Sequence, residues 1–219
     1  FTTSTLQQTA SSRLGFGASR TMQIAQKIYQ GVEIDGETIG LITYMRTDGT
    51  NLSKDAIIAF RNYIQKEIGK EYLPKVALNY SGKKAKNAQE AHEAIRPTDI
   101  VRTPQSVKKY LSTDQYKLYD LIWRKALSSQ MESANFDRNT ITITSDTNDT
   151  VCKASGSVLK FDGFLKIYNN QSKDDDENIL PAVSKGPINI EALLDEQHYT
   201  QPPPRYSEAS LVKKLEELG

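Results

Sequence analysis

The sequence predicts an α+β fold in which a mainly helical, winged-helix-like domain is followed by an antiparallel β-rich domain. Apolar residues recur at helical spacing between capping signals through residues 1–132, and near residue 133 the period changes to alternation. Residues 202–204 are three prolines, which form a stiff extended connector before a last helical pattern. We therefore expect a helical domain over 1–132, a β-rich domain over 133–197, and the start of a further helical element over 198–219.

Two helices are expected at the beginning of the chain. Ser4 and Gln7 have the spacing of a capping box, which predicts a helix that ends near Gly15. Apolar residues then return at helical spacing over 20–30, and Gly31 is the stop signal for this second helix.

A hairpin and a third helix are expected next. Asp35-Gly36 suits the positive φ of a tight turn, so residues 32–42 predict a hairpin whose second strand leads to Tyr44. Ser53 is expected to cap the following helix. Helix, helix, hairpin and helix is an order compatible with a winged-helix-like DNA-binding arrangement, although a fold alone does not give a function.

Two more helices complete the helical domain. One begins near residue 88, carries His92 and must stop before Pro97, because the residue before a proline disfavours the α conformation. The other covers residues 104–130, with Trp123 expected in the core.

The alternating segments predict the elements of the β-rich domain. Short strands are expected over residues 140–144, 151–158, 164–168, 179–183 and 188–194. The acidic stretch 171–178 suits a solvated loop better than a cation site, because the spacing of cation ligands is missing. Ser207 is expected to cap the last helix.

Charge is divided unevenly along the chain. Residues 1–132 carry a net charge of +6 and residues 133–219 one of −5. The basic half also holds Tyr44, a distribution expected when a DNA-facing part is joined to a part without DNA contacts. The single cysteine, Cys152, excludes an internal disulfide and suits a reducing cytoplasm. No apolar run approaches the ~20 residues of a membrane span, and Phe1 begins no signal peptide, so we expect an internal fragment without membrane contact.

Tyr44 and Arg46 stand two positions apart in the segment 41–53, LITYMRTDGTNLS. If residues 41–46 are extended, the two side chains point to the same face. A tyrosine hydroxyl, with a pKa near ~10, is a poor nucleophile unless a cation stabilises its phenolate, and a guanidinium can do this while it also holds a phosphate oxygen. From spacing alone, a tyrosine on a half-buried strand beside a solvated arginine is the commoner outcome.

The same segment resembles the active-site segment of the type IA DNA topoisomerases. Four further segments resemble that family in the same order: TSTLQQTASSRLGFG (3–17), QEAHEAIRPTD (89–99), ILPAVSKG (179–186) and PPPRYSEASLVKKLEELG (202–219). Met45 is typical of the bacterial topoisomerase I branch, whereas topoisomerase III usually has proline there. Gly49 departs from the family, which mostly has serine.

The resemblance implies an isomerase and assigns roles to its residues. It implies that Tyr44 attacks one DNA strand to form a 5′-phosphotyrosine intermediate, that Arg46 positions the phosphate, and that His92 lies near that phosphate. Another strand passes through the gap and the break is resealed, which relaxes negative supercoils without ATP. Asp48 either completes this phosphate site by orienting Arg46 or, as we favour, shapes the turn with Gly49.

The resemblance also implies Mg²⁺ in the complete enzyme, bound by an acidic N-terminal domain that this sequence does not contain. We therefore expect no metal site in this fragment and no cleavage by the fragment alone. The segment HEAIR at 92–96 lacks the second histidine of a zinc-binding HExxH motif. Arg96 is expected to contact DNA or to pair with Glu93 or Asp99.

The expected partner is DNA, in the single-stranded regions of a negatively supercoiled duplex, and the expected protein is a monomer at the nucleoid in the bacterial cytoplasm. The β-rich domain resembles the arch of a toroid that opens for strand passage. Two alternatives stay open: a non-catalytic winged-helix-type DNA-binding module, or a fragment of topoisomerase III or reverse gyrase. A Tyr44 exposed in a groove favours the enzyme, and a buried Tyr44 favours the module.

Overall fold

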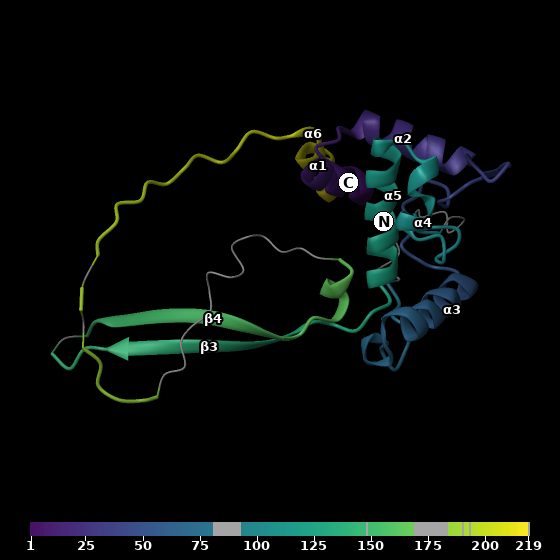
Figure 1. Ribbon diagram of the computed structural model, residues 1–219. Coiled ribbons are helices and arrows are strands. Elements are labelled where there is room, and N and C mark those ends of the chain that lie inside the picture. The colour runs from purple at the N-terminus through teal and green to yellow at the C-terminus, as the bar shows by residue number, and fades with distance from the viewer. Residues whose placement is uncertain (81–92, 148, 169–183, 190, 193, 219) are drawn as a thin grey trace. The chain divides into compact units, whose positions relative to one another are not determined.

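The computed structural model describes residues 1–80, 93–147, 149–168, 184–189, 191–192 and 194–218, with the backbone alone at Glu216 and Glu217. The chain divides into two compact units, which are treated separately. Unit 1 comprises Phe1–Ala134, Asp162–Asn170 and Tyr206–Gly219, and unit 2 comprises Asn135–Phe161 and Gln171–Arg205. Helices dominate the first and an antiparallel pair of strands forms the second, which confirms the α+β class (Figure 1).

Unit 1 is built from helices and one small hairpin. Among its described residues the helices are α1 (Thr3–Leu14), α2 (Ala18–Gln30), α3 (Lys54–Tyr63), α4 (Pro104–Val107), α5 (Thr113–Ser128) and α6 (Glu208–Leu218). A π-helical turn covers Ile64–Ile68, and 3₁₀ turns cover Lys70–Tyr72, Lys108–Tyr110 and Gly163–Lys166. No helix in the described part of the chain is both long and apolar enough to cross a membrane.

The predicted hairpin is present directly after α2. Strands β1 (Val32–Ile34) and β2 (Glu37–Ile39) pair antiparallel, with Glu33 opposite Thr38. Asp35 and Gly36 form the turn with φ values of 51° and 90°, the positive values that the sequence predicts there.

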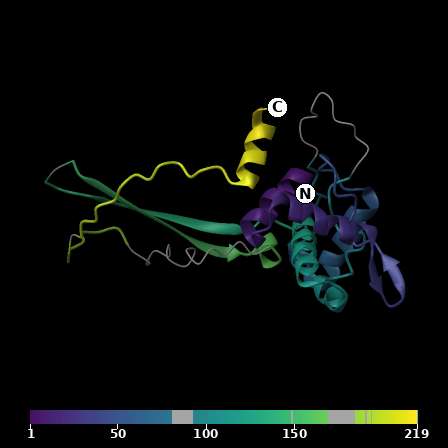
Figure 2. The same ribbon diagram turned by 90° about the horizontal axis from the view of Figure 1, so that it is seen from above.

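The core of unit 1 is centred on α5. Leu118, Tyr119 and Ile122 of this helix are completely buried, and the α1 and α2 helices pack against it with buried residues of their own (Figures 1 and 2). Trp123 is also buried, and its indole Nε1 donates a hydrogen bond to Ile100 O at 2.9 Å. The prediction that Trp123 is a core residue is therefore confirmed.

The first helix begins two residues earlier than predicted. Its capping box is formed by Thr2 and Thr5, not by Ser4 and Gln7: Thr5 N donates to Thr2 Oγ1 at 3.3 Å, and Thr2 N donates to Thr5 Oγ1 at 2.8 Å. The helix ends as predicted, because Gly15 has the left-handed φ of 68° that a C-terminal glycine readily adopts.

The predicted helix over 104–130 is two helices, α4 and α5. Ser112 starts α5 with a capping box, in which Gln115 N donates to Ser112 Oγ at 3.3 Å and Ser112 N donates to Gln115 Oε1 at 2.9 Å. This local cap interrupts the helical period. Ser207 caps α6 as predicted, with Ser210 N donating to Ser207 Oγ at 3.2 Å.

The prediction of a helix that ends before Pro97 is wrong for those of its residues that the structure describes. Residues 88–92 lie outside the described residues, and residues 93–96 are not helical. Instead, Ala94 N donates to Asn51 O at 2.9 Å. The N–H of Ala94 thus donates to a residue far away in the sequence, and not to the carbonyl four residues before it as in a helix.

Unit 2 contains one long antiparallel pair, β3 (Asn135–Thr144) and β4 (Val151–Phe161). The strands run side by side, with Thr140 opposite Ser155 (Figures 1 and 2). The strands predicted over 140–144 and 151–158 lie within this pair and are confirmed.

The later predicted strands have a different outcome. Residues 164–168 form no strand, because Gly163, with φ of 48°, turns the chain into a 3₁₀ helix and Phe164 N donates to Glu132 O at 2.9 Å. The described residues of 188–194 also form no strand, and their apolar side chains Ile188 and Leu194 are exposed. The strand predicted over 179–183 and the acidic stretch 171–178 lie outside the described residues.

Candidate nucleic-acid interface

The segment around Tyr44 alternates between buried and exposed side chains without being part of a sheet. Met45 is 1% exposed and Thr47 is 7% exposed, whereas the intervening Tyr44 is 37% exposed and Arg46 and Asp48 are also exposed. The structure therefore presents Tyr44, Arg46 and Asp48 at the surface, as expected for extended backbone. Among the described residues, the segment makes one isolated antiparallel β-bridge, between Ile42 and Pro97.

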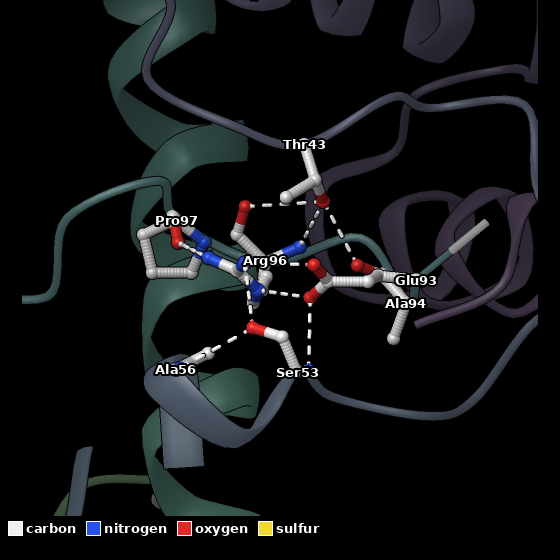
Figure 3. Close-up of polar contacts among 7 residues, drawn as sticks. All are labelled: Thr43, Ser53, Ala56, Glu93, Ala94, Arg96 and Pro97. Carbon is white, nitrogen blue, oxygen red and sulfur yellow. Dashed lines mark hydrogen bonds and ion pairs between the residues drawn. The ribbon is translucent and has the colours of Figure 1, made fainter. Parts of the chain in front are cut away.

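One side of the segment is fixed by Thr43 (Figure 3). Thr43 N donates to Arg96 O at 2.9 Å, and Thr43 Oγ1 donates to Ala94 O at 2.8 Å. Arg96 N in turn donates to Thr43 Oγ1 at 3.0 Å. These bonds hold the backbone directly before Tyr44 against residues 94–97.

The other side of the segment is fixed by Thr3, in the first turn of α1. Thr3 N donates to Thr47 O, Thr3 Oγ1 donates to Met45 O, and Thr47 N donates to Thr3 Oγ1, each at 2.8 Å. Thr47 also closes the following turn, because its Oγ1 accepts from Gly49 N at 2.9 Å. The residue that shapes this turn is therefore Thr47, where the sequence favoured Asp48.

The ring of Tyr44 packs edge-to-face on Tyr29, near the end of α2. The two ring centroids are 5.4 Å apart and the planes are inclined by 62°. Such pairs prefer this geometry, so Tyr29 restricts the orientation of the Tyr44 phenol.

Arg46 and Asp48 face different hollows of the surface. Arg46 lines one of about 450 Å³ beside α2, with Met22 and Lys27 among its other walls. Asp48 lines one of about 490 Å³ beside the first turn of α1. No ion pair joins the two side chains, and Arg46 pairs with no carboxylate in the described part of the chain. The structure thus leaves the guanidinium of Arg46 available to an external anion.

Arg96 is occupied by contacts within the protein (Figure 3). Its Nε donates to Glu93 Oε2 at 2.7 Å, its Nη2 donates to Glu93 Oε1 at 3.1 Å, and its Nη1 donates to Pro97 O at 3.0 Å. The hydrogen bonds from Arg96 lower the pKa of the Glu93 carboxyl, while partial burial opposes this. Of the expected alternatives for Arg96, the structure contains the pair with Glu93, which rigidifies the segment that holds Thr43.

His92 lies outside the described residues. Two residues later, Ala94 O accepts the hydroxyl of Thr43. The described residues bring together no group of three or more histidine, cysteine, aspartate and glutamate side chains that could hold a metal ion.

The structural residues of this site were not identified from the sequence. Thr3, Thr43 and Tyr29 carry no motif of their own, and their partners are 15 to 53 residues away in the chain. The one available signal was the alternation of residues 43–48. An alternating segment has buried positions, and these need contacts from neighbouring parts of the chain.

Comparisons with known proteins connect this geometry to one family. The sequence model of a family described as DNA topoisomerase matches residues 1–219. A curated DNA topoisomerase 1 of Rickettsia conorii is 52% identical over 223 residues, and one of Helicobacter pylori is 50% identical over 220 residues; each match covers 100% of this chain and 29% of the relative. The solved structure of full-length topoisomerase I from Thermotoga maritima superposes with a TM-score of 0.78 at 37% identity, covering 100% of this chain and 34% of that one. The chain therefore spans about 29% of the length of these curated relatives.

We predict that Thr43→Val destabilises unit 1 by about 1–3 kcal/mol, because Ala94 O and Arg96 N lose their shared partner while the side chain keeps its shape. Urea unfolding measures this change in the free energy of unfolding. Thr43→Ser keeps the hydroxyl and is the matched control. Equal stability of the valine and serine variants would show that these hydrogen bonds contribute nothing.

We predict that Glu93→Gln flattens the acid limb of the stability curve. The folded pKa of Glu93 lies below its unfolded value of about 4.3, so its contribution is present above that pH and is lost as the pH falls through the folded pKa. Because its side chain is 35% exposed, solvent screening limits the contribution to about 1 kcal/mol.

Thermal unfolding at a series of pH values below neutrality checks this. Glu67→Gln, which alters the more exposed pair with Lys66 at 3.6 Å, is the control and should follow the parent curve. A Glu93→Gln curve parallel to the parent below pH ~4 would contradict the assignment.

Proposed function

Since this chain belongs to the DNA topoisomerase family, we propose that it is the part of a bacterial type IA enzyme that carries the nucleophilic tyrosine, Tyr44. The complete protein would cleave one DNA strand, pass another through the gap and reseal the break, which relaxes negative supercoils. One observation carries the assignment to Tyr44: it and Arg46 are exposed on the same segment, which buried Met45 and Thr47 hold in place.

In this proposal the phenol oxygen of Tyr44 attacks the phosphorus of a DNA strand. A bond forms between that oxygen and phosphorus, and the bond from phosphorus to the 3′ oxygen breaks. The proton lost by the phenol is balanced by the proton that the 3′ oxygen takes up, so cleavage is neutral in protons. The phosphotyrosyl ester keeps the energy of the broken diester, and resealing therefore needs no ATP.

Arg46 supplies the cation that this chemistry requires. A guanidinium beside the attacked phosphate stabilises both the phenolate and the negative charge that develops in the transition state. The lack of an internal carboxylate partner for Arg46 among the described residues supports this role. The edge-to-face contact with Tyr29 supports the proposed role of Tyr44. A phenol ring whose orientation is already restricted loses less freedom when it reacts.

His92 and Asp48 complete the proposed phosphate site. His92, which lies outside the described residues, would donate to a phosphate oxygen, as the family resemblance implies. A carboxylate repels a phosphate, so Asp48 would act indirectly, by adjusting the backbone that carries Arg46. Asp48 faces its own hollow beside α1, which favours this indirect role.

The Mg²⁺ that we propose for the complete enzyme does not fit the described residues of this chain. They provide no cluster of three acidic or histidine ligands. No step above is therefore routed through the metal, and we assign its binding to another part of the protein. We likewise propose that the β-rich domain expected over 133–197, apart from Asp162–Asn170, which belong to unit 1, is part of an arch that opens for strand passage. The helical domain over 1–132 precedes it, and a further helical element starts at 198.

The exposure of Tyr44 supports the enzyme over a non-catalytic winged-helix module, which would bury the ring. The relatives compared above are named DNA topoisomerase 1, which supports that branch over topoisomerase III and reverse gyrase. We propose single-stranded regions of negatively supercoiled DNA as the substrate, and a monomer in the bacterial cytoplasm at the nucleoid as the working state.

In the complete enzyme, Tyr44→Phe should abolish cleavage, because it removes the attacking oxygen and keeps the packing on Tyr29. Arg46→Ala should leave slow cleavage, reduced by about 10²–10³-fold, because the nucleophile remains while charge stabilisation is lost. Trapping the covalent adduct on a 3′-labelled oligonucleotide and mapping the modified peptide by mass spectrometry separates the two variants. An adduct on another tyrosine, or undiminished cleavage by Tyr44→Phe, refutes the assignment.

The 219-residue chain alone should bind single-stranded DNA weakly, with a Kd in or above the micromolar range and a steep dependence on salt, and should not relax plasmid DNA. The chain contains the cations that we assign to the phosphate, whereas we assign the metal site to another part of the protein. Fluorescence anisotropy at two salt concentrations and a gel relaxation assay with Mg²⁺ measure the two properties. Robust relaxation would show that the catalytic machinery lies within this chain.

A further inference from the structure

Unit 1 contains a second candidate site, away from Tyr44 and Arg46. It is a cavity of about 680 Å³ between α1, α5 and the segment around Tyr168, and neither Tyr44 nor Arg46 lines it. Its volume lies within the range of roughly 300–1,000 Å³ that is typical of small-ligand sites. Lys125, Tyr80 and several serine and threonine side chains are among its walls.

Two cations lie over Tyr168, one of the residues that line this cavity. The guanidinium of Arg13 lies 4.1 Å from the ring centroid of Tyr168, and the ammonium of Lys125 lies 4.9 Å from the same centroid. Tyr168 is only 7% exposed. Neither cation pairs with a carboxylate among the described residues. Burial, and next the charge of Arg13, lower the pKa of Lys125, so the fold holds two like charges that an anion would relieve.

The hydroxyl groups around the cavity are arranged as acceptors. Thr9 Oγ1 donates to Thr5 O at 2.8 Å, and Ser129 Oγ donates to Ala126 O at 2.6 Å. Each hydroxyl has thus used its proton within its own helix and keeps lone pairs for an external N–H donor. The edges of nucleobases carry such donors, whereas inorganic phosphate at neutral pH offers mainly acceptors.

An aromatic side chain completes the wall. Tyr80 lines the cavity, is half exposed, and is held by its hydroxyl, which donates to Ser129 O at 2.9 Å. The Tyr168 ring is almost fully buried and already has Arg13 and Lys125 over it, so it is not available for stacking. Tyr80 is therefore the ring available to a base.

We propose that this cavity binds one nucleotide of a single-stranded nucleic acid, with its phosphate on Arg13 and Lys125 and its base against Tyr80. A single phosphate between two cations and a base on one ring are the contacts by which proteins bind single strands without sequence preference. The identification of the ligand as DNA rests on the proposed function; the cations, the ring and the acceptor hydroxyls are independent of it.

The cavity is connected to the Tyr44 segment along α1. Thr2 and Thr5 line both this cavity and the hollow that contains Thr47 and Asp48. Thr3 and Arg13 lie ten residues apart on α1, a rise of about 15 Å along the helix axis. A strand held at Tyr44 could thus be held a second time by the same protein unit, at a distance set by this helix.

The test uses the complete enzyme in EDTA and a labelled oligothymidylate in fluorescence anisotropy. Arg13→Gln combined with Lys125→Gln should raise the Kd about tenfold at low salt and reduce the slope of log K against log salt by about 0.7, the value for one single-strand phosphate contact. Lys66→Gln combined with Lys70→Gln removes the same charge from an exposed turn and should change the Kd less than twofold.

A second measurement does not depend on the folding of the charge variants. An oligonucleotide that carries 5-bromodeoxyuridine should crosslink to the peptide containing Tyr80 in the unmodified enzyme, and Tyr80→Leu should remove that crosslink. Absence of the crosslink, or a Kd and salt slope unchanged by the Arg13 and Lys125 substitutions, overturns the proposal and leaves these cations as supports for Tyr168. If Tyr44 still cleaves DNA in that case, this inference fails alone; an enzyme that binds no oligonucleotide refutes the proposed function as well.

Discussion

The backbone of residues 41–47 is the constraint on which the candidate site depends. Four of its seven residues are buried, yet it belongs to neither a helix nor a strand ladder, so the polar groups of its backbone must find partners elsewhere. Leu41 N donates to Ile28 O at the end of α2, Thr43 bonds to residues 94–96, and Thr47 bonds to Thr3 in α1. Three distant parts of the chain therefore meet at this segment, and their positions decide which of its side chains face outward.

The charged groups of unit 1 divide according to whether the protein supplies their partner. Arg96 has a side chain only 12% exposed and a bidentate carboxylate, so its charge is compensated within the fold. Arg46, Arg13 and Lys125 have no carboxylate partner in the described residues, and Lys125 lies against a second cation. All three side chains are exposed, so an external phosphate can supply the partner that the fold does not. This contrast supports a nucleic-acid role more directly than the net charge does.

Some local signals in the sequence predicted local structure correctly, although the first capping box is formed by Thr2 and Thr5 and not by Ser4 and Gln7. The turn at Asp35-Gly36 and the cap at Ser53 involve contacts within four residues, and both are present. The helix expected up to residue 96 and the strand expected over 164–168 fail for the opposite reason, because Asn51 and Glu132 take the decisive hydrogen bonds from outside those segments. The spacing of Tyr44 and Arg46 predicted that both side chains point to the same face, and both are exposed, whereas their proposed chemistry comes from the family resemblance. The cavity was not predicted, because it joins residues from opposite ends of unit 1.

The two candidate sites share one rigid element, α1. Thr3 in its first turn holds the backbone of Met45 and Thr47, and Arg13 in its last turn lies on Tyr168. Leu6 and Ala10 between them are completely buried, so the helix cannot move at one end without disturbing the core. The spacing between the sites is therefore fixed by the length of a helix rather than by a loop. A single strand is flexible, and a protein that must align one phosphodiester with one phenol oxygen gains most from a second hold at a constant distance, because that hold removes freedom from the strand before the reaction.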